Sequence, residues 1–202
     1  MSGNSFGFEA AAHDQCVPLP LQGDVDVEVQ ALVLGMIGHS ASPDFIEGTT
    51  AWLAGSTRLA RKDAERSLSE RGLPTFGAWV LLPEPRLLQP GPLAFLRAGP
   101  LATGASDDDA LGAVFDLSAE LYGELEVDAL DTASGDAFVV RRRPVLTVDG
   151  ERQVHEQQLV LWPRPDDEVV IHLSVYAVDL VQGGRAGQPL RELAASLCWS
   201  IT

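Results

Sequence analysis

Cysteine and lysine are almost absent from this chain. Two cysteines, Cys16 and Cys198, occur among 202 residues, which excludes the disulfide-rich scaffolds of small secreted domains. Cys198 lies in the run ASLCWSI, where we expect a buried thiol that acts as a small apolar side chain. Lys62 is the single lysine, and the other basic residues are all arginine.

Positive charge is scarce overall. The chain has 29 acidic and 14 basic residues, for a net charge of -15. Nucleic acids and anionic membrane surfaces both attract clustered lysine and arginine, so this composition argues against both as partners. Residues 98–140 contain no basic residue, and this acidic segment either keeps the protein in solution or suits a basic partner.

Long apolar runs are missing too. No run approaches the roughly 20 residues that a membrane-spanning helix needs. The first basic residue is Arg58 and no apolar stretch follows Met1, so the pattern of a secretory signal is lacking. We therefore expect a protein without membrane insertion that resides in the cytoplasm.

The remaining composition is that of an ordinary globular protein, 46% hydrophobic and 21% charged. A chain of 202 residues suits one domain. The first residues are weakly patterned and contain glycine, alanine and proline. We therefore expect a mobile N-terminal lead over 1–20 and a single α+β domain over 21–202.

The first half of the chain is expected to mix strands and helices. Apolar and polar residues alternate from Val25 and predict a strand that runs into LVLGMIGHSAS, residues 32–42. Apolar residues at helical spacing predict a helix over 56–71. TFGAWVLLP and LAFLRAGPLA predict strands. Ser106 followed by three aspartates is typical of a helix N-terminus and predicts a helix over 106–122.

The last third predicts an antiparallel meander. ELEVDALD and DAFVVRRR flank a loop at 132–135, in a register that places Glu126 opposite Arg141. Asp149-Gly150 is typical of a two-residue hairpin turn, and a further hairpin joins VHEQQLVLW to VVIHLSVYAVDL. A final helix is expected over 189–198. The whole pattern predicts one antiparallel sheet of about six to seven strands packed with about three helices.

The last hairpin is expected to have two unlike faces. With Leu159 opposite His172, the core face carries only apolar side chains: Val160, Trp162, Val169, Ile171, Leu173 and Val175. The other face is amphipathic, and it either packs under a helix or forms a recognition surface. We take its Gln157, His172, Ser174 and Tyr176, together with a loop over 182–188, as the candidate binding site for a protein.

One motif gives a catalytic alternative. Gly38-His39-Ser40-Ala41-Ser42 approaches the G-x-S-x-G elbow of hydrolases, which would make the chain a serine hydrolase using Ser40 with His172. However, Ser42 replaces the final glycine and Pro43 follows at once. We therefore favour the end of a strand at this point and predict no catalytic residue.

No cofactor or metal is expected either. His155 and His172 share a face in the expected register, but they lie about 13 Å apart, too far for one zinc ion. The segment GGRAGQP has glycines but lacks the Lys-Ser/Thr that a phosphate-binding loop requires.

The order of elements carries a resemblance to a known fold. It is based on AFVVRRRPVLTVDGERQVHEQQLVLWPRPDDEVVIHLSVYAVDL followed by PLRELAASLCWSI, and on LSERGLPTFGAWVLLPEPR. Over residues 25–202 the chain resembles the PsbP-like fold of the photosystem PsbP proteins, the Ran-binding Mog proteins and the LpqN-type lipoproteins, and in its middle part GC-rich bacterial relatives. The resemblance implies an α/β/α sandwich. It also implies a non-catalytic binding or assembly role, chaperone-like for secreted proteins in some bacterial members. This chain lacks the lipoprotein signal of the exported members, so we expect a cytoplasmic adaptor with a protein partner.

Overall fold

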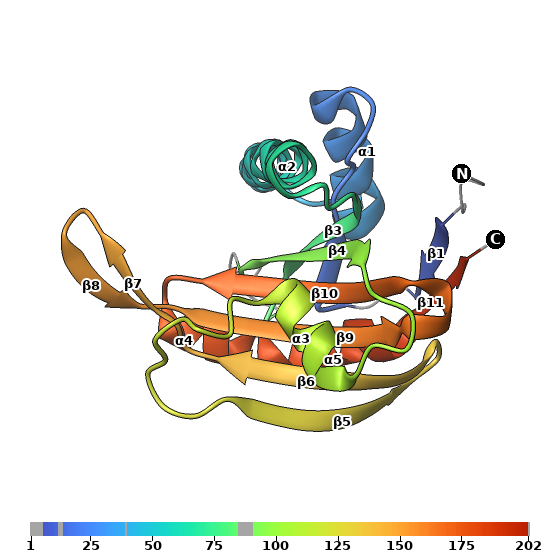
Figure 1. Cartoon of the computed structure of the whole chain (residues 1–202). Helices are drawn as coiled ribbons and strands as arrows, with labels where there is room; N and C mark the ends of the chain where they lie inside the picture. Colours follow the sequence, from blue (N-terminus) through green and yellow to red (C-terminus); the bar gives the residue numbers. More distant parts are fainter. Residues whose placement is uncertain (1–5, 12–13, 39, 85–90, 202) are drawn as a thin grey trace.

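An antiparallel sheet of seven strands forms the centre of the protein (Figure 1). The computed structural model describes residues 6–11, 14–38, 40–84 and 91–201. Helices lie on both faces of the sheet, and the α+β class expected from the sequence is confirmed.

The strands of the central sheet are β2 (Cys16–Pro18), β3 (Thr75–Leu81), β4 (Leu93–Pro100), β5 (Glu126–Thr132), β6 (Gly135–Arg142), β9 (Glu156–Arg164) and β10 (Val169–Ala177). Their order across the sheet is β2-β3-β4-β10-β9-β6-β5. Two small ribbons pair β1 (Phe6–Ala10) with β11 (Leu197–Ile201) and β7 (Val145–Val148) with β8 (Glu151–Val154). The α-helices are α1 (Val25–Ile37), α2 (Pro43–Arg71), α3 (Asp107–Val114), α4 (Leu180–Arg185) and α5 (Gly187–Ser196), and a 3-10 helix, η2 (Pro165–Asp167), joins β9 to β10.

One face of the sheet, here called the closed face, is covered by α4 and α5. Its core combines strand residues with the apolar stripe of α5: Trp79, Leu81, Leu96, Val139, Val160, Trp162, Ile171, Leu173, Val175, Leu190, Leu193 and Ala194. Trp162 is fully buried, and its indole N–H donates to the Thr132 hydroxyl at 2.9 Å. The core face expected for the last hairpin is therefore confirmed.

The other face, here called the open face, is covered in two separate places. Helices α1 and α2 pack over β3 and β4 through a core that includes Val29, Val33, Leu53, Ala78 and Val80. Helix α3 packs over β6 and β9 through a core that includes Ala110, Phe115, Val140, Leu159 and Leu161. Between them the surface is hollowed. The β7–β8 ribbon projects at one end of the sheet (Figure 1).

The expected hairpins form. Glu126 lies opposite Arg141, and Asp149 and Gly150 have φ values of 51° and 83°, the left-handed conformation that a tight hairpin turn requires. In the last hairpin the register differs by two residues from the expected one, because Leu161 lies opposite His172. Side chains alternate with a period of two, so this difference leaves each residue on its expected face.

The strand expected from Val25 is wrong, because helix α1 occupies this segment. The Asp24 carboxylate caps the helix by accepting hydrogen bonds from the backbone N–H groups of Asp26 and Val27, at 3.0 and 3.1 Å. The alternating valines suggested a strand, but Val29 and Val33 are the residues buried, four positions apart.

The lead expected over 1–20 also needs correction. Strand β1 pairs with β11, and β2 adds to the edge of the central sheet beside β3. Wherever the structure describes this segment, it is part of the domain.

Three helices differ from their expected bounds. Helix α2 begins at Pro43, well before residue 56, because Ser42 caps it and Pro43 fits its first turn. Helix α3 ends at Val114, where the next residue, Phe115, turns to an extended conformation and its ring packs in the core with Arg142 stacked 4.0 Å from the ring centre. The last helix, α5, spans Gly187–Ser196 and is followed by a strand. None of the helices in the described ranges combines the length and the apolar character that crossing a bilayer requires.

Candidate functional site

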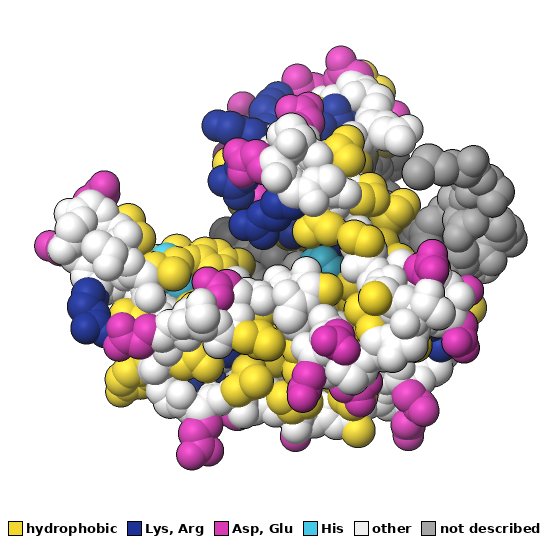
Figure 2. All heavy atoms as spheres, viewed as in Figure 1, with side chains coloured by type: hydrophobic (Ala, Val, Ile, Leu, Met, Phe, Trp, Pro, Cys, Tyr) yellow, Lys and Arg dark blue, Asp and Glu magenta, His cyan; other side chains and the backbone are white. Residues whose placement is uncertain are grey.

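A groove of about 660 Å³ lies on the open face between α2, α3 and the β7–β8 ribbon. Figure 2 shows this hollow beneath α2, with apolar side chains along its floor and basic side chains on the α2 side. It is lined by Leu59, Asp63, Arg66, Arg71, Leu93, Phe95, Arg97, Val114, Phe115, Leu146, Gln157, Leu159, His172, Ser174, Val175 and Tyr176. We call it the His172 groove.

The four candidate binding residues on β9 and β10 all line this groove. Strand alternation places them on one face, and the pairing sets Tyr176 opposite Gln157 and Ser174 opposite Leu159. Because β9 and β10 are central strands, bonded to neighbours on both sides, the floor of the groove is a rigid surface.

His172 lies in the floor and is only 4% exposed. Neither ring nitrogen has a hydrogen-bond partner among the residues that the structure describes. Burial, reinforced by the positive charges of Arg97 and Arg71, lowers the pKa of His172 to about 3. The imidazole is therefore neutral at physiological pH, with one donor and one acceptor nitrogen.

The α2 side of the groove gathers positive charge. Arg97 lies directly opposite His172 on β4, forms an ion pair with Asp63 and donates to the Thr75 hydroxyl at 3.1 Å. Arg66 also binds the Asp63 carboxylate, at 2.6 Å. Asp63 thus balances two arginines at once, and Arg71 forms no ion pair with any carboxylate in the described ranges.

Tyr176 forms an exposed edge of the groove, with 44% of its surface accessible. Its hydroxyl contacts Nδ1 of His155, and the two rings lie 5.1 Å apart. Gln157 is fixed by Arg142, whose Nε donates to the Gln157 side-chain oxygen at 2.6 Å. The ring of Tyr176 is therefore positioned before any ligand arrives.

The serine hydrolase alternative required Ser40 to meet His172, and the structure does not bring them together. Ser40 lies exposed in the turn between α1 and α2, at the N-terminal end of α2. His172 lies beside Arg97, which binds Asp63, and Asp63 is roughly 30 Å along α2 from that end at about 1.5 Å per residue.

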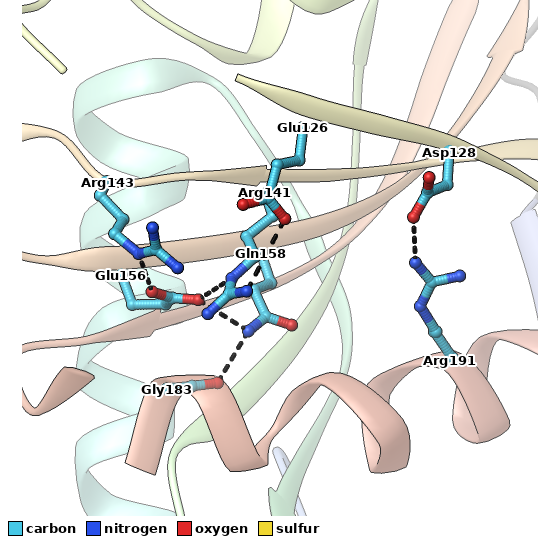
Figure 3. Close-up of polar contacts among 8 residues, drawn as sticks. All are labelled: Glu126, Asp128, Arg141, Arg143, Glu156, Gln158, Gly183 and Arg191. Atoms are coloured by element: carbon cyan, nitrogen blue, oxygen red, sulfur yellow. Dashed lines mark hydrogen bonds and ion pairs between the residues drawn. The ribbon is translucent and has the colours of Figure 1, made fainter. Parts of the chain in front are cut away.

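The loop expected over 182–188 is also not part of this site. Residues Leu180–Arg185 form helix α4, and α5 begins at Gly187. Both lie on the closed face, where Gln158 donates a hydrogen bond to the Gly183 carbonyl at 2.7 Å (Figure 3). The binding site expected from the sequence is therefore divided between opposite faces of the sheet.

A buried carboxylate organises the closed face at this point. Glu156 is 0% exposed and forms ion pairs with Arg141 and, at 3.0 Å, with Arg143 (Figure 3). Burial opposes ionisation of Glu156, but hydrogen bonds from the two arginines and Gln158 outweigh it and lower its pKa. Each oxygen of Glu156 has a partner, so this cluster fastens β6, β9 and α4 together.

Among the described residues no group of three or more histidine, cysteine or acidic side chains is placed to hold a metal. The histidines at 155 and 172 lie further apart than expected, because His172 pairs with Leu161, six positions along the chain from His155.

Sequence reasoning missed the side chains that α2 and β4 contribute, namely Asp63, Arg66, Arg71 and Arg97. They come together only because α2 crosses the sheet beside β4. The charges at 63, 66 and 71 on one predicted helix were a usable signal for one charged face, but nothing local indicated that this face borders the strands of the last hairpin.

Comparisons with known proteins give no family for this chain. No protein-family model matches it, and a search of the curated proteins finds no relative. The chemistry of the groove is therefore the basis for inferring function.

Proposed function

We propose that this chain is a non-catalytic binding module that holds a segment of a protein partner in the His172 groove. The observation that carries the proposal is the interrupted helix cover of the open face. There, strands β9 and β10 present a rigid amphipathic floor bordered by the exposed ring of Tyr176. Such a surface can bind a partner with little loss of conformational entropy of its own.

The dimensions of the groove favour an extended segment. Three neighbouring strands, β4, β10 and β9, form the floor, which is roughly 10 Å wide across the strands. A segment that runs across the strands covers this width with about three extended residues. Apolar side chains from α2, β4 and β9, among them Leu59, Phe95 and Leu159, line it together with polar ones. A mixed lining of this kind suits alternate apolar and polar side chains of a peptide.

The resemblance to the PsbP-like fold supports the same class of function. Helices on both faces of an antiparallel sheet are the arrangement that the resemblance implies, and its members serve mainly in binding and assembly. On this basis we infer an adaptor role, or a chaperone-like one, in the cytoplasm.

A photo-crosslinking amino acid at position 176 tests the proposal in the native host. We expect one defined partner to be captured there, and the capture to be reduced by excess unlabelled wild-type protein but not by excess Tyr176→Ala protein. The matched control is position 122, where Tyr122 is 62% exposed and is not among the residues lining the groove. The same adducts at both positions would contradict the proposal.

A thermal melt of Tyr176→Ala separates a binding role from a structural one. Since Tyr176 is 44% exposed, we expect the variant to lose only about 1 kcal/mol of unfolding free energy. Trp162→Ala, in the core of the closed face, should lose several times more. A loss in Tyr176→Ala as large as in Trp162→Ala would assign Tyr176 to the core and remove it from the proposed site.

A further inference from the structure

We propose that the partner segment is mainly apolar and carries one or two carboxylates, which Arg71 and Arg66 bind on the α2 side of the His172 groove. This inference rests on the proposed function and adds the chemistry of the ligand. It follows from the charge of the groove, from the unpaired imidazole in its floor, and from the orientation of α2.

The charge of the groove is opposite to that of the chain. The chain has a net charge of -15, yet the described lining residues include three arginines and a single carboxylate, Asp63. Asp63 is shared between Arg97 and Arg66, and Arg71 is left without a counter-ion among the described residues. An arginine fork without a counter-ion is suited to binding a carboxylate.

The floor of the groove has an unused polar group. His172 is buried, lines the groove and has two ring nitrogens without described partners, an arrangement that costs free energy in the unbound protein. As a neutral imidazole it offers one N–H donor and one acceptor. Both nitrogens lie beneath the surface of the floor, so the carbonyl and N–H groups of a bound segment pair with them only when the side chains around His172 shift.

A carboxylate fits the groove better than a phosphate does. Phosphate sites commonly use backbone N–H groups at a helix N-terminus, where the helix dipole is positive. The end of α2 at this groove is its C-terminus, since Arg71 is its last residue and Gly72 closes it. The dipole there is negative, so it disfavours any anion, and a doubly charged phosphate more than a singly charged carboxylate.

The overall charge of the protein limits how acidic the segment can be. A strongly acidic partner is repelled by the rest of the surface at low salt. The apolar side chains of the groove, including Leu59, Phe95 and Phe115, instead favour a segment in which a few carboxylates alternate with apolar side chains. The arginines of the groove also repel basic segments, which adds specificity.

Selection from a random peptide library displayed on phage tests the inference. The library is panned against the wild-type protein, and each selected peptide is measured by fluorescence polarisation with wild type, Tyr176→Ala, Arg71→Gln and Arg58→Gln. Arg58 is the matched control, because it lies on the same helix but pairs with Asp26 on the α1 side. Arg58→Gln removes the same charge as Arg71→Gln, at a residue that does not line the groove.

We expect the selected peptides to be enriched in Asp or Glu beside apolar residues and to lose binding in Tyr176→Ala. Replacing the acidic residue of a peptide by its amide should weaken binding to wild type about tenfold. Arg71→Gln should remove most of that difference, and Arg58→Gln should leave it unchanged.

The other outcomes separate the two proposals. Peptides that need Tyr176 but show no preference for acid overturn the carboxylate assignment and leave the binding function intact. Tighter binding of a phosphoserine counterpart also overturns it, in favour of a phosphopeptide. If no selected peptide depends on Tyr176, both proposals fail.

Discussion

The two faces of the central sheet both bury polar side chains, but they satisfy them differently. On the closed face, Glu156 is fully buried and paired with Arg141, Arg143 and Gln158. On the open face, His172 is 4% exposed, and its ring nitrogens have no partner in the described part of the chain.

The paired carboxylate and the unpaired imidazole indicate different roles for the two faces. A buried charge whose hydrogen bonds are complete fixes the packing of the elements that supply them. A buried polar group without a partner lowers stability, and functional sites are among the places where native proteins tolerate such a group. The closed face is therefore the scaffold, and the open face is where we infer binding.

The largest effect is expected for Glu156→Ala. Removing this carboxylate leaves Arg143 without a counter-ion among the described residues and leaves Arg141 with only the exposed carboxylate of Glu126. We expect a loss of about 3 kcal/mol of unfolding free energy, measured by chemical denaturation. The control is Glu126→Ala, whose exposed carboxylate also pairs with Arg141, at 3.7 Å, and which should lose less than about 0.5 kcal/mol. Equal losses in both variants would show that the closed face is not held by this cluster.

The next effect concerns His172 and pH. The pKa of His172 is about 3 in the folded protein against the usual 6.5 of a histidine in an unfolded chain, so below pH 6.5 the unfolded chain binds a proton that the folded one does not. Stability should therefore fall as the pH drops from 6.5 towards 3. Between about pH 7.5 and pH 5 this group alone should cost wild type about 2 kcal/mol, a loss that His172→Leu avoids.

Urea denaturation of both proteins at the two pH values measures this difference, because the other titrating groups are common to both. If wild type and His172→Leu lose the same stability on acidification, His172 is not buried in its neutral form. The contrast between the two faces would then disappear.

Alanine substitutions at two neighbouring glycines of α4 should change stability less, and in opposite directions from each other. A Cβ at Gly183 would lie 2.6 Å from the Cβ of Glu156, so Gly183→Ala should lose about 1 kcal/mol or more. At Gly184 the nearest atom is a side-chain nitrogen of Arg141 at 3.6 Å, so Gly184→Ala should gain about 0.5 kcal/mol, as alanine usually does in a helix. Melting curves of the pair check the sign, and stabilisation by both would mean that α4 is not packed tightly on Glu156.

The smallest expected effect is chemical and leaves the fold unchanged. Cys16 belongs to the core of the closed face, and burial, with the charge of Glu192, raises the pKa of its thiol to about 12. Cys198 is exposed on β11, contrary to the burial expected from its apolar neighbours. A thiol reagent at mildly alkaline pH should therefore react quickly with Cys198 alone, and with both thiols in denaturant. Equal rates in the native protein would show that the closed face opens readily.

Local rules were sufficient for much of the sheet. The turn at Asp149-Gly150 and the pairing of Glu126 with Arg141 depend on nearby residues only, and both form as expected. The two faces of the last hairpin were also predictable, because a period of two survives even a register difference of two residues. For the same reason strand alternation alone predicts that His172 and Tyr176 share one surface, as they do in the structure.

The tertiary structure decided what the sequence left ambiguous. In α1 the valines fit both a strand and a helix, and burial of Val29 and Val33 in the core shared with α2 selects the helix. At the end of α3, the helical pattern continues beyond Val114, but the helix stops there and Phe115 packs against Val140 and Leu159 in the core, with Arg142 stacked on its ring. Each case depends on a partner distant in sequence, which no local window contains.

The candidate site shows the same division. By itself the sequence determined which face of β9 and β10 carries polar side chains, because strand geometry assigns alternate residues to alternate faces. Only the packing of α2 across the sheet brings Asp63, Arg66 and Arg71 beside Arg97 and His172, and only the gap between α2 and α3 leaves that face accessible. The position of α2 and the gap beside it depend on how helices far apart in the chain pack on one sheet. Close packing of whole side-chain clusters decides this arrangement, and residues that are neighbours in sequence do not.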